Sequence, residues 1–381
     1  MRLPSLPGAD DPVVTEIVEA AARLALGRRS AELDLAPEFP RSEFRALGTA
    51  GLLGLATATE HGGRGLPLPR VATALFHLAY LGGTTFAKLS LQPEFSSVLG
   101  DHGSGPLCDR YYRPLLRGEC LVGNQVTEPG AGADAGGLAL RAERSGDEFV
   151  LRGTKSEVAF AQDADAAIVY ARERTGSTDL GISAFLVPQH LPGVTPTIVP
   201  DLGERWMRRG TVVYDGVRIP LDHRIGEAGA AFGYLKRELT RERALLAAIY
   251  LGVARASWEE TVRHVGERTA FGRPLAAQQA VAFPLVEDGA RLDAAWMYAE
   301  RTIASIAEGA PADGSAALSK WMAVETALGV LDHAIQFHGG RGYSKALPHE
   351  QRWRDVRSGA IAHGPSEIMH VVAARELWPR P

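Results

Sequence analysis

The spacing of apolar residues divides this chain into three blocks. Near the N-terminus apolar residues recur at steps of three and four, which is the period of one buried helix face. These positions are Val14, Ile17, Val18, Ala21 and Leu24. A second apolar helix pattern surrounds residues 71–81, and helical patterns continue to about Gly118. The first block is therefore predicted to be helical.

The second block, from about Leu121, consists of short runs rich in β-branched and aromatic residues. The runs are 149–151, 167–170, 182–187 and 211–214. Gly, Pro and Asp separate them at roughly even spacing, which is typical of a small all-β domain. The glycine-rich stretch 226–233 is interpreted as the end of this block.

The third block begins after Gly233, where the helical period returns. One apolar stripe contains Leu246, Ile249, Val253 and Ala256. Further patterns cover 278–308 and 315–337, and a last helix is expected to begin with Pro365 at its first position. We predict an α+β multi-domain protein. Its predicted parts are an N-terminal α-helical domain (1–119), a middle β-barrel-like domain (120–229) and a C-terminal helical bundle (230–381).

Composition excludes several classes of function. The 381 residues carry 41 basic and 45 acidic side chains, a net charge of -4, which gives no footprint for nucleic acid or an anionic membrane. Two cysteines, Cys108 and Cys120, are too few for a disulfide scaffold, and we expect a cytoplasmic protein. We find no signal peptide, no apolar stretch of bilayer length and no metal-ligand spacing among the 11 histidines.

A first glycine-rich segment follows Gln125. Residues 130–135 formally satisfy the dinucleotide pattern G-x-G-x-x-A, which needs a strand before it and a helix directly after it. Here Pro129 precedes the pattern, and Gly136 and Gly137 follow it, which starts a helix poorly. We therefore reject a Rossmann site. Taken alone, the segment is best interpreted as a surface loop.

Two further segments change that interpretation. Residues 336–343 read Gln-Phe-His-Gly-Gly-Arg-Gly-Tyr, and residues 268–272 read Arg-Thr-Ala-Phe-Gly. Each alone could be a turn or a helix end. Together with residues 125–134, they resemble the flavin-binding signature of the acyl-CoA dehydrogenases. The resemblance runs from about Glu60 to Glu376, and the order of helices, strands and helices also agrees with that family's fold.

The resemblance implies an FAD site and an oligomer. In the family, the segment matching 125–134 lies against the flavin, and the matches of Arg268 and Phe271 contact the flavin of a neighbouring subunit. The match of Gln279 reaches the adenine side. The matches of Gln336, Gly339 and Gly340 face the ADP half of the cofactor. The expected cofactor-binding residues are Gln125, Val126, Thr127, Gly132, Ala133, Arg268, Phe271, Gln279, Gln336, Gly339, Gly340 and Glu367. A homotetramer or homodimer is implied, with an electron-transfer flavoprotein or another acceptor as redox partner.

The catalytic base departs from the commonest family pattern. Most members place a glutamate just before a glycine near the C-terminus, and the matching residue here is His363. Isovaleryl-CoA dehydrogenase and some long-chain members place it on an earlier helix, where this chain has Glu242 followed by Arg243. Glu242 is four residues before Leu246, so it is expected on the buried face, where burial raises a carboxyl pKa. His363 stays an alternative base or a polar pocket residue, and Glu367 is a poorer candidate.

Other departures concern the flavin ring. The family usually has an aromatic residue and a threonine beside the ring, where this chain has Glu157 and Ala159. Ala133 and Pro365 stand where serine and threonine are common. We expect FAD-dependent α,β-dehydrogenation of an acyl thioester carried by CoA, with Glu242 as base and Arg243 as a positioning residue. Alternatives are a substrate on an acyl carrier protein, a non-catalytic binder of flavin or thioester, and a flavin oxidase or monooxygenase.

Overall fold

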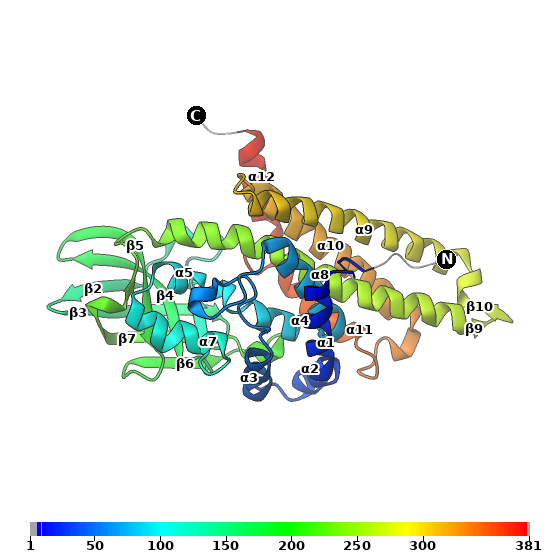
Figure 1. The fold of residues 1–381 in the computed structure, drawn as a ribbon, viewed down its shortest axis with the longest axis horizontal. Coiled ribbons are helices and arrows are strands. Elements are labelled where there is room, and N and C mark those ends of the chain that lie inside the picture. The colour runs from blue at the N-terminus through cyan, green and yellow to red at the C-terminus, as the bar shows by residue number, and fades with distance from the viewer. Residues whose placement is uncertain (1–5, 9, 379–381) are drawn as a thin grey trace.

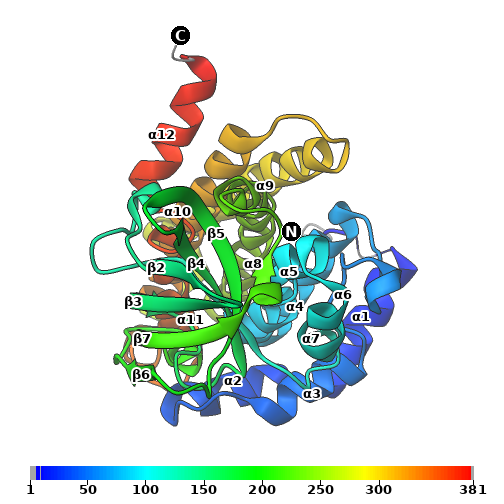
Figure 2. The ribbon, with the colours of Figure 1, turned by 90° about the vertical axis from the view of Figure 1, so that its left-hand side faces the viewer.

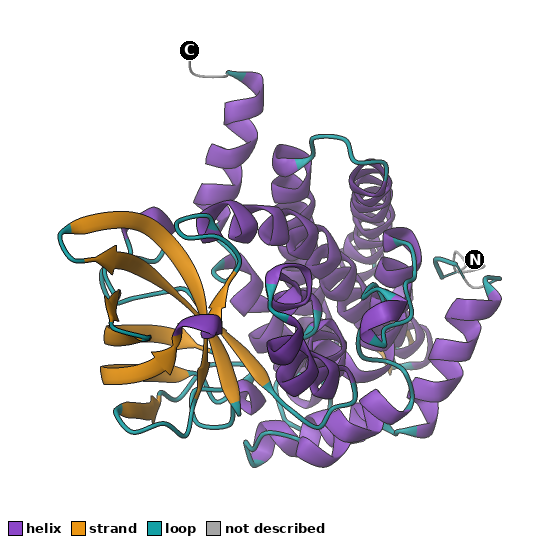
Figure 3. Ribbon diagram, turned by 60° about the vertical axis from the view of Figure 1, so that its left-hand side comes forward, coloured by secondary structure: helices purple, strands orange, loops and turns teal. Residues whose placement is uncertain are grey.

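The computed structural model describes residues 6–8 and 10–378 and contains three parts. A helical N-terminal part packs against a central helical body, and the strands of the middle part gather at one end of the molecule (Figure 1). Figure 3 shows the same division, with the strands grouped on one side of the helices. The predicted order of helices, strands and helices is confirmed.

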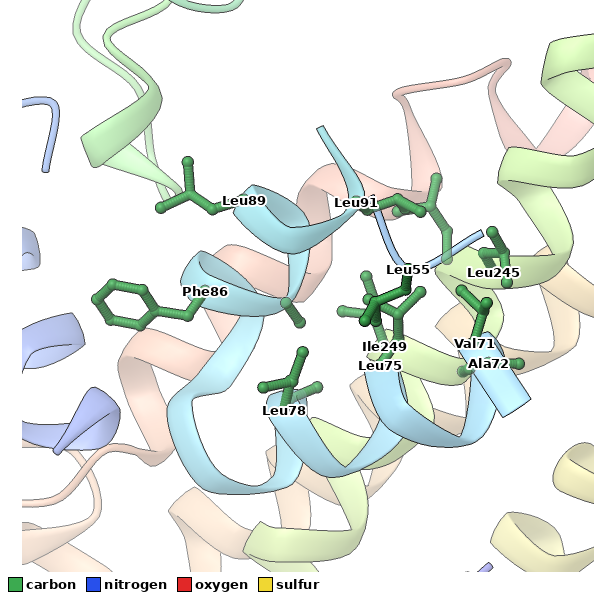
Figure 4. Packing of buried hydrophobic residues seen from close by; sticks show 14 of the residues in the cluster. Leu55, Val71, Ala72, Leu75, Leu78, Phe86, Leu89, Leu91, Leu245 and Ile249 are labelled. Carbon is green, nitrogen blue, oxygen red and sulfur yellow. The ribbon is translucent and has the colours of Figure 1, made fainter. Parts of the chain in front are cut away.

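The N-terminal helices enclose an apolar core that they share with the C-terminal part. They are α1 (Pro12–Arg23), α2 (Leu26–Leu35), α3 (Arg41–Thr49), α4 (Leu68–Leu91), α5 (Ser97–His102), α6 (Gly105–Leu107) and α7 (Arg113–Leu116). The longest of them, α4, bends at Gly83, which has a φ of 71° that a residue with a Cβ rarely adopts. Buried side chains of α4 pack against Leu245 and Ile249 of the C-terminal part (Figure 4).

The middle part is one twisted sheet with its own apolar core. Its strands are β1 (Val122–Gln125), β2 (Arg141–Ser145), β3 (Glu148–Val158), β4 (Ala166–Thr175), β5 (Thr178–Pro188), β6 (Val194–Ile198), β7 (Gly210–Pro220) and β8 (Arg224–Ile225). Their order is β6-β7-β3-β2-β4-β5-β8, and β1 pairs in parallel with β4. Phe149, Phe185 and Tyr214 lie in the core between them. The predicted all-β block is confirmed, although β3, β4, β5 and β7 are each longer than the runs found in the sequence.

The C-terminal part is built around one long helix. Its elements are α8 (Ala231–Glu267), β9 (Thr269–Ala270), β10 (Arg273–Pro274), α9 (Gln279–Ala307), α10 (Asp313–Phe337), α11 (His349–Arg357) and α12 (Ser366–Leu377). α8 packs against α4, α9 and α10. α12 stands out from the body of the molecule (Figure 2). Pro365 directly precedes this last helix as its N-cap, one residue before the position expected for it.

Every residue of α8 from 242 to 258 is buried. The sequence had indicated a single apolar stripe through Leu246, Ile249 and Val253. That expectation was too narrow, because neighbours cover this helix on all sides, and alanine and glycine fill the positions between the large residues. In the part of the chain that the structure describes, no helix combines the length and apolar composition needed to cross a bilayer.

Candidate active site

Glu242 lies where α8 enters the core of the molecule. Glu242 is only 4% exposed to solvent, so its carboxyl group is removed from water. Because the whole segment 242–258 is buried, the spacing to Leu246 could not by itself have distinguished Glu242 from its neighbours. The prediction that Glu242 is buried is nevertheless confirmed.

A tight turn between α11 and α12 brings His363 to Glu242. His363 has a φ of 57° and Gly364 a φ of 96°, so two successive residues are in left-handed conformations. Arg243 Nε donates a hydrogen bond to the carbonyl oxygen of His363 at 3.1 Å. Lys320 Nζ donates to the carbonyl of Gly364 at 2.7 Å and to that of Ala362. These two basic side chains from α8 and α10 hold the turn in place.

The three residues predicted to be catalytic therefore meet in one place. His363 Nε2 is 3.6 Å from Glu242 Oε2. The His363 ring stacks on Phe95 at 5.1 Å between centroids, and its Nδ1 is buried without a hydrogen-bond partner. Arg243 supports this arrangement through the backbone of His363. It is thus placed to position the turn.

The electrostatics favour Glu242 over His363 as the base. Burial raises the pKa of Glu242 well above its ordinary value, and the nearby Glu238 carboxylate raises it further, while Arg243 opposes the change. Burial lowers the pKa of His363 well below its ordinary value, helped by Lys320, Lys88 and Arg243. A carboxylate with a raised pKa binds a proton more strongly than an imidazole with a lowered one.

The sequence analysis did not identify other charged residues around this site. Glu238 is 6% exposed and precedes Glu242 by one helical turn. Glu94 is also buried, and it accepts a hydrogen bond from Arg241 at 2.9 Å. Glu238 could have been predicted from the sequence, because a residue four positions before Glu242 lies on the same helix face. Nothing local in the sequence joins Glu94 to α8.

Contacts within the β-domain occupy the Gln125 side chain and the carbonyl groups of Val126 and Thr127. Gln125 is fully buried, and its Oε1 accepts a hydrogen bond from Tyr214 inside the β-domain at 2.7 Å. The carbonyl of Val126 accepts from Lys155, and that of Thr127 from the Ser156 amide. A contact from the Gln125 side chain is therefore not available while this packing holds. Gly132 and Ala133 lie on the exposed loop beyond.

The segment predicted around Arg268 lies at the other end of the molecule. Arg268 caps α8, and Phe271 sits at the tip of the β9–β10 hairpin with 97% of its surface exposed. Gln279 is exposed at the start of α9. Figure 1 places this hairpin at the end of the molecule opposite the sheet. One subunit therefore cannot bring Arg268 and Phe271 to the loop after β1.

The glycine loop after α10 lies beside that hairpin. The His264 ring of α8 stacks on the His338 ring at 4.2 Å between centroids, so the ends of α8 and α10 meet. Gln336, Gly339 and Gly340 are exposed. A Cβ built on either glycine would have no atom within 4 Å, so both backbones are open to a ligand. These residues, with Arg268, fit the diphosphate and adenosine half of FAD.

The ring half of the cofactor finds fewer side-chain partners. Glu157, at the aromatic position of the family pattern, has a φ of 56° and pairs with Arg209 at 3.4 Å. Ala159 has no hydroxyl to donate. Glu367 is exposed in the first turn of α12. The residues present thus fit the diphosphate and adenosine half of FAD, and they offer the flavin ring few side-chain partners.

Comparison with known proteins decides the family. The chain matches the models of the acyl-CoA dehydrogenase N-terminal, middle and C-terminal domains over residues 13–119, 123–217 and 230–378. The chain belongs to the acyl-CoA dehydrogenase family. It is accordingly a flavin-dependent oxidoreductase of the acyl-CoA dehydrogenase type, with FAD as its cofactor.

Two relatives and one solved structure show how far this likeness extends. The benzylmalonyl-CoA dehydrogenase of Aromatoleum aromaticum is 33% identical over 355 residues, covering 92% of this chain and 93% of that protein. The 3-(aryl)acrylate reductase of Clostridium sporogenes is 31% identical over 351 residues, covering 91% and 92%. The butyryl-CoA dehydrogenase of Megasphaera elsdenii superposes with a TM-score of 0.89 at 25% identity, covering 99% and 100%. This acyl-CoA dehydrogenase homologue therefore shares the full domain arrangement.

Proposed function

We propose that this acyl-CoA dehydrogenase homologue oxidises the α,β-carbon pair of an acyl thioester, with Glu242 as the base. The observation that carries the proposal is a buried carboxyl group, 4% exposed, whose pKa is raised well above its ordinary value. Such a group is costly to bury unless it has a task. Its neighbour at 3.6 Å is the imidazole of His363, which takes the place of the family's commoner glutamate.

The residues divide the work as follows. Glu242 must be ionised to remove the α-proton, and its raised proton affinity makes the removal more favourable. FAD, when bound, supplies the acceptor for the β-hydride. Arg243 and Lys320 fix the turn that carries His363. His363 stays neutral beside Glu242, so it adds no positive charge that would weaken the base.

We also propose that each FAD site is shared by two subunits. The support is the separation, within one subunit, of the sheet that contains β1 from the β9–β10 hairpin, beside which the Gly339 loop lies. A neighbouring copy would supply the second set and cover Phe271. Tetramer and dimer both satisfy this requirement.

The carrier of the acyl group and the electron acceptor belong to the proposal as well. CoA and an acyl carrier protein present the same thioester arm, and we favour CoA because relatives of this chain are named for CoA thioesters. We propose an electron-transferring flavoprotein as acceptor, since one structure of this fold, 26% identical with a TM-score of 0.91, is described by that name. Cys108 and Cys120 are free and buried, which fits the cytoplasm.

An anaerobic titration of the FAD-loaded protein with butyryl-CoA tests the reaction. Loss of the oxidised flavin absorption is expected, and Glu242→Gln should slow it at least about 1000-fold, because an amide cannot take the proton. Glu19→Gln, on the exposed face of α1, is the matched control and should behave as the wild type. The same acyl group on a carrier protein is offered in parallel. Crotonyl-CoA added to the dithionite-reduced protein tests the reverse direction.

The outcomes separate the alternatives. If only the carrier-bound acyl group reduces the flavin, the substrate is carried by an acyl carrier protein and not by CoA. Full activity of Glu242→Gln, with loss of activity in His363→Ala, would transfer the base to His363. If dithionite reduces the flavin but no thioester of a chain-length series does, the dehydrogenase proposal is wrong.

A further inference from the structure

Two buried glutamates lie one turn apart on the same face of α8. Glu238 and Glu242 are 6% and 4% exposed, and their spacing of four residues places them about 6 Å apart along the helix axis. Like charges at this spacing repel, and burial strengthens the repulsion. The reaction proposed above uses Glu242 and leaves Glu238 without a role.

The Glu238 carboxyl group is held by three hydrogen-bond donors. Its Oε1 accepts from the Val98 amide at 2.6 Å and from Ser97 Oγ at 3.1 Å. Its Oε2 accepts from Tyr170 Oη at 3.1 Å. The donors come from α5 and β4, so two separate parts of the fold fix one carboxyl group. Donors of this kind favour the ionised form over the neutral one.

Glu238 also lines a cavity of about 160 Å³ between α5 and α8. The residues lining it are Ser97, Val98, Asp101, His102, Tyr234, Arg237, Glu238 and Arg241. Most of them are polar, and Asp101 and Arg237 are exposed. Glu238 therefore has a polar route to solvent along which it can exchange a proton.

We propose that Glu238 is a positioning residue for the base: the fixed charge of its anchored carboxylate makes Glu242 a stronger base than it would be alone. This inference rests on the proposed function of Glu242. The donors favour the charged form of Glu238, which it takes above about pH 7, and this charge disfavours ionisation of Glu242. Once Glu242 is ionised, its affinity for the α-proton is correspondingly higher.

The charges around the pair are consistent with this role. The titratable groups around it are Glu94, Asp101, His102, Tyr170, Arg237, Arg241, Arg243 and His363, and Lys88 and Lys320 act on His363. Glu94 is paired with Arg241, and Asp101 adds to the negative charge near Glu238. Burial raises the pKa of Glu238 to about 7, while its three donors lower it. Glu238 therefore gains its negative charge as the pH rises through about 7.

Infrared titration of the FAD-loaded protein without substrate tests the inference. The protonated carboxyl band that Glu242→Gln abolishes reports the proton on Glu242, whether or not the protein turns over a thioester. In Glu238→Gln this band should titrate about 1–2 pH units lower than in the wild type, since the neighbouring charge is gone. The acid limb of flavin reduction by butyryl-CoA should move by the same amount, and the plateau rate should fall.

Two further variants guard against a simple loss of structure. Tyr170→Phe removes one donor and should shift the Glu242 band in the same direction by less, because Glu238 then ionises less readily. Glu238→Asp keeps a carboxylate and should restore part of the wild-type midpoint. An unchanged Glu242 midpoint in both Glu238→Gln and Tyr170→Phe would overturn the inference. A shifted band with full activity of Glu242→Gln would instead overturn the proposed function and leave the charge coupling intact.

Discussion

At the scale of single residues, Lys320 shows how a buried charge serves the site at a cost in stability. It is 1% exposed, and burial lowers its pKa to about 7, helped by Arg243 and Lys88. In the unfolded chain a lysine keeps its ordinary pKa, so between about pH 7 and 10.5 the unfolded state binds more protons than the folded one. The contribution of Lys320 to the free energy of unfolding therefore rises as the pH increases from about 7 to 10.5.

We expect Lys320→Met to remove this dependence. The free energy of unfolding of the wild type, minus that of the variant, should increase by roughly 3–5 kcal/mol from pH 7 to 10.5. Urea unfolding at four pH values measures it. Lys236→Met on the exposed part of α8 is the control, and its difference from the wild type should stay flat. A flat difference for Lys320→Met too would mean that the buried amine keeps an ordinary pKa.

The residues of the site were only partly predictable from the sequence. Glu242 was found through the family pattern, and periodicity added little because all of 242–258 is buried. His363 was found as a departure from that pattern. Glu94 and Phe95 were missed because their nearness to Arg241 and His363 depends on tertiary packing across the molecule.

At the scale of elements, the contact of α4 with α8 depends on one glycine. A Cβ on Gly252 would lie 2.2 Å from the backbone oxygen of Phe76, which is too close for the two helices to keep their distance. Gly252→Ala should therefore lower the free energy of unfolding by about 1–3 kcal/mol through overpacking. Gly266→Ala on the same helix has nothing within 4 Å and should raise it by about 0.5–1 kcal/mol. Thermal unfolding of both variants compares them, and equal effects would contradict the close-packing argument.

Elements were more predictable than residues because helix and strand periods are local. Residues 278–308 and 315–337 were expected to be helical, and α9 and α10 cover Gln279–Ala307 and Asp313–Phe337. The bend of α4 at Gly83 was not expected. It becomes visible only once the φ of that glycine is known, since glycine inside an apolar helix pattern is compatible with a straight helix as well.

At the scale of the whole molecule, buried ion pairs connect the three parts. Lys88 of α4 pairs with Glu204 of the loop before β7, and the Glu204 amide donates to Asp355 of α11 at 2.5 Å. Arg354 and Asp34 form a further pair at 2.7 Å between α11 and α2. Apart from Glu350, one turn before Arg354 on α11, the side-chain partners of Arg354 and Asp355 could not be predicted from the sequence, because they lie more than 100 positions away.

Subunit association is the property that the surface of this molecule predicts most directly. Phe283, Val286 and Met297 are 56%, 61% and 68% exposed on one face of α9, and exposed apolar side chains that cluster in this way mark interaction surfaces. We expect Val286→Arg to raise the dissociation constant of the oligomer at least about tenfold, because a charge would be buried without a partner. Sedimentation equilibrium measures the change.

A matched variant separates this surface from exposed apolar residues in general. Leu35 is 62% exposed at the end of α2, in the N-terminal part, and Leu35→Arg should leave the association unchanged. Because the FAD site is proposed to need Phe271 from a second copy, flavin retained after gel filtration should fall in Val286→Arg alone. If the wild-type protein is monomeric and still holds FAD, the proposal that two subunits share each FAD site is wrong. One subunit cannot bring the β9–β10 hairpin to the sheet at the other end of the molecule.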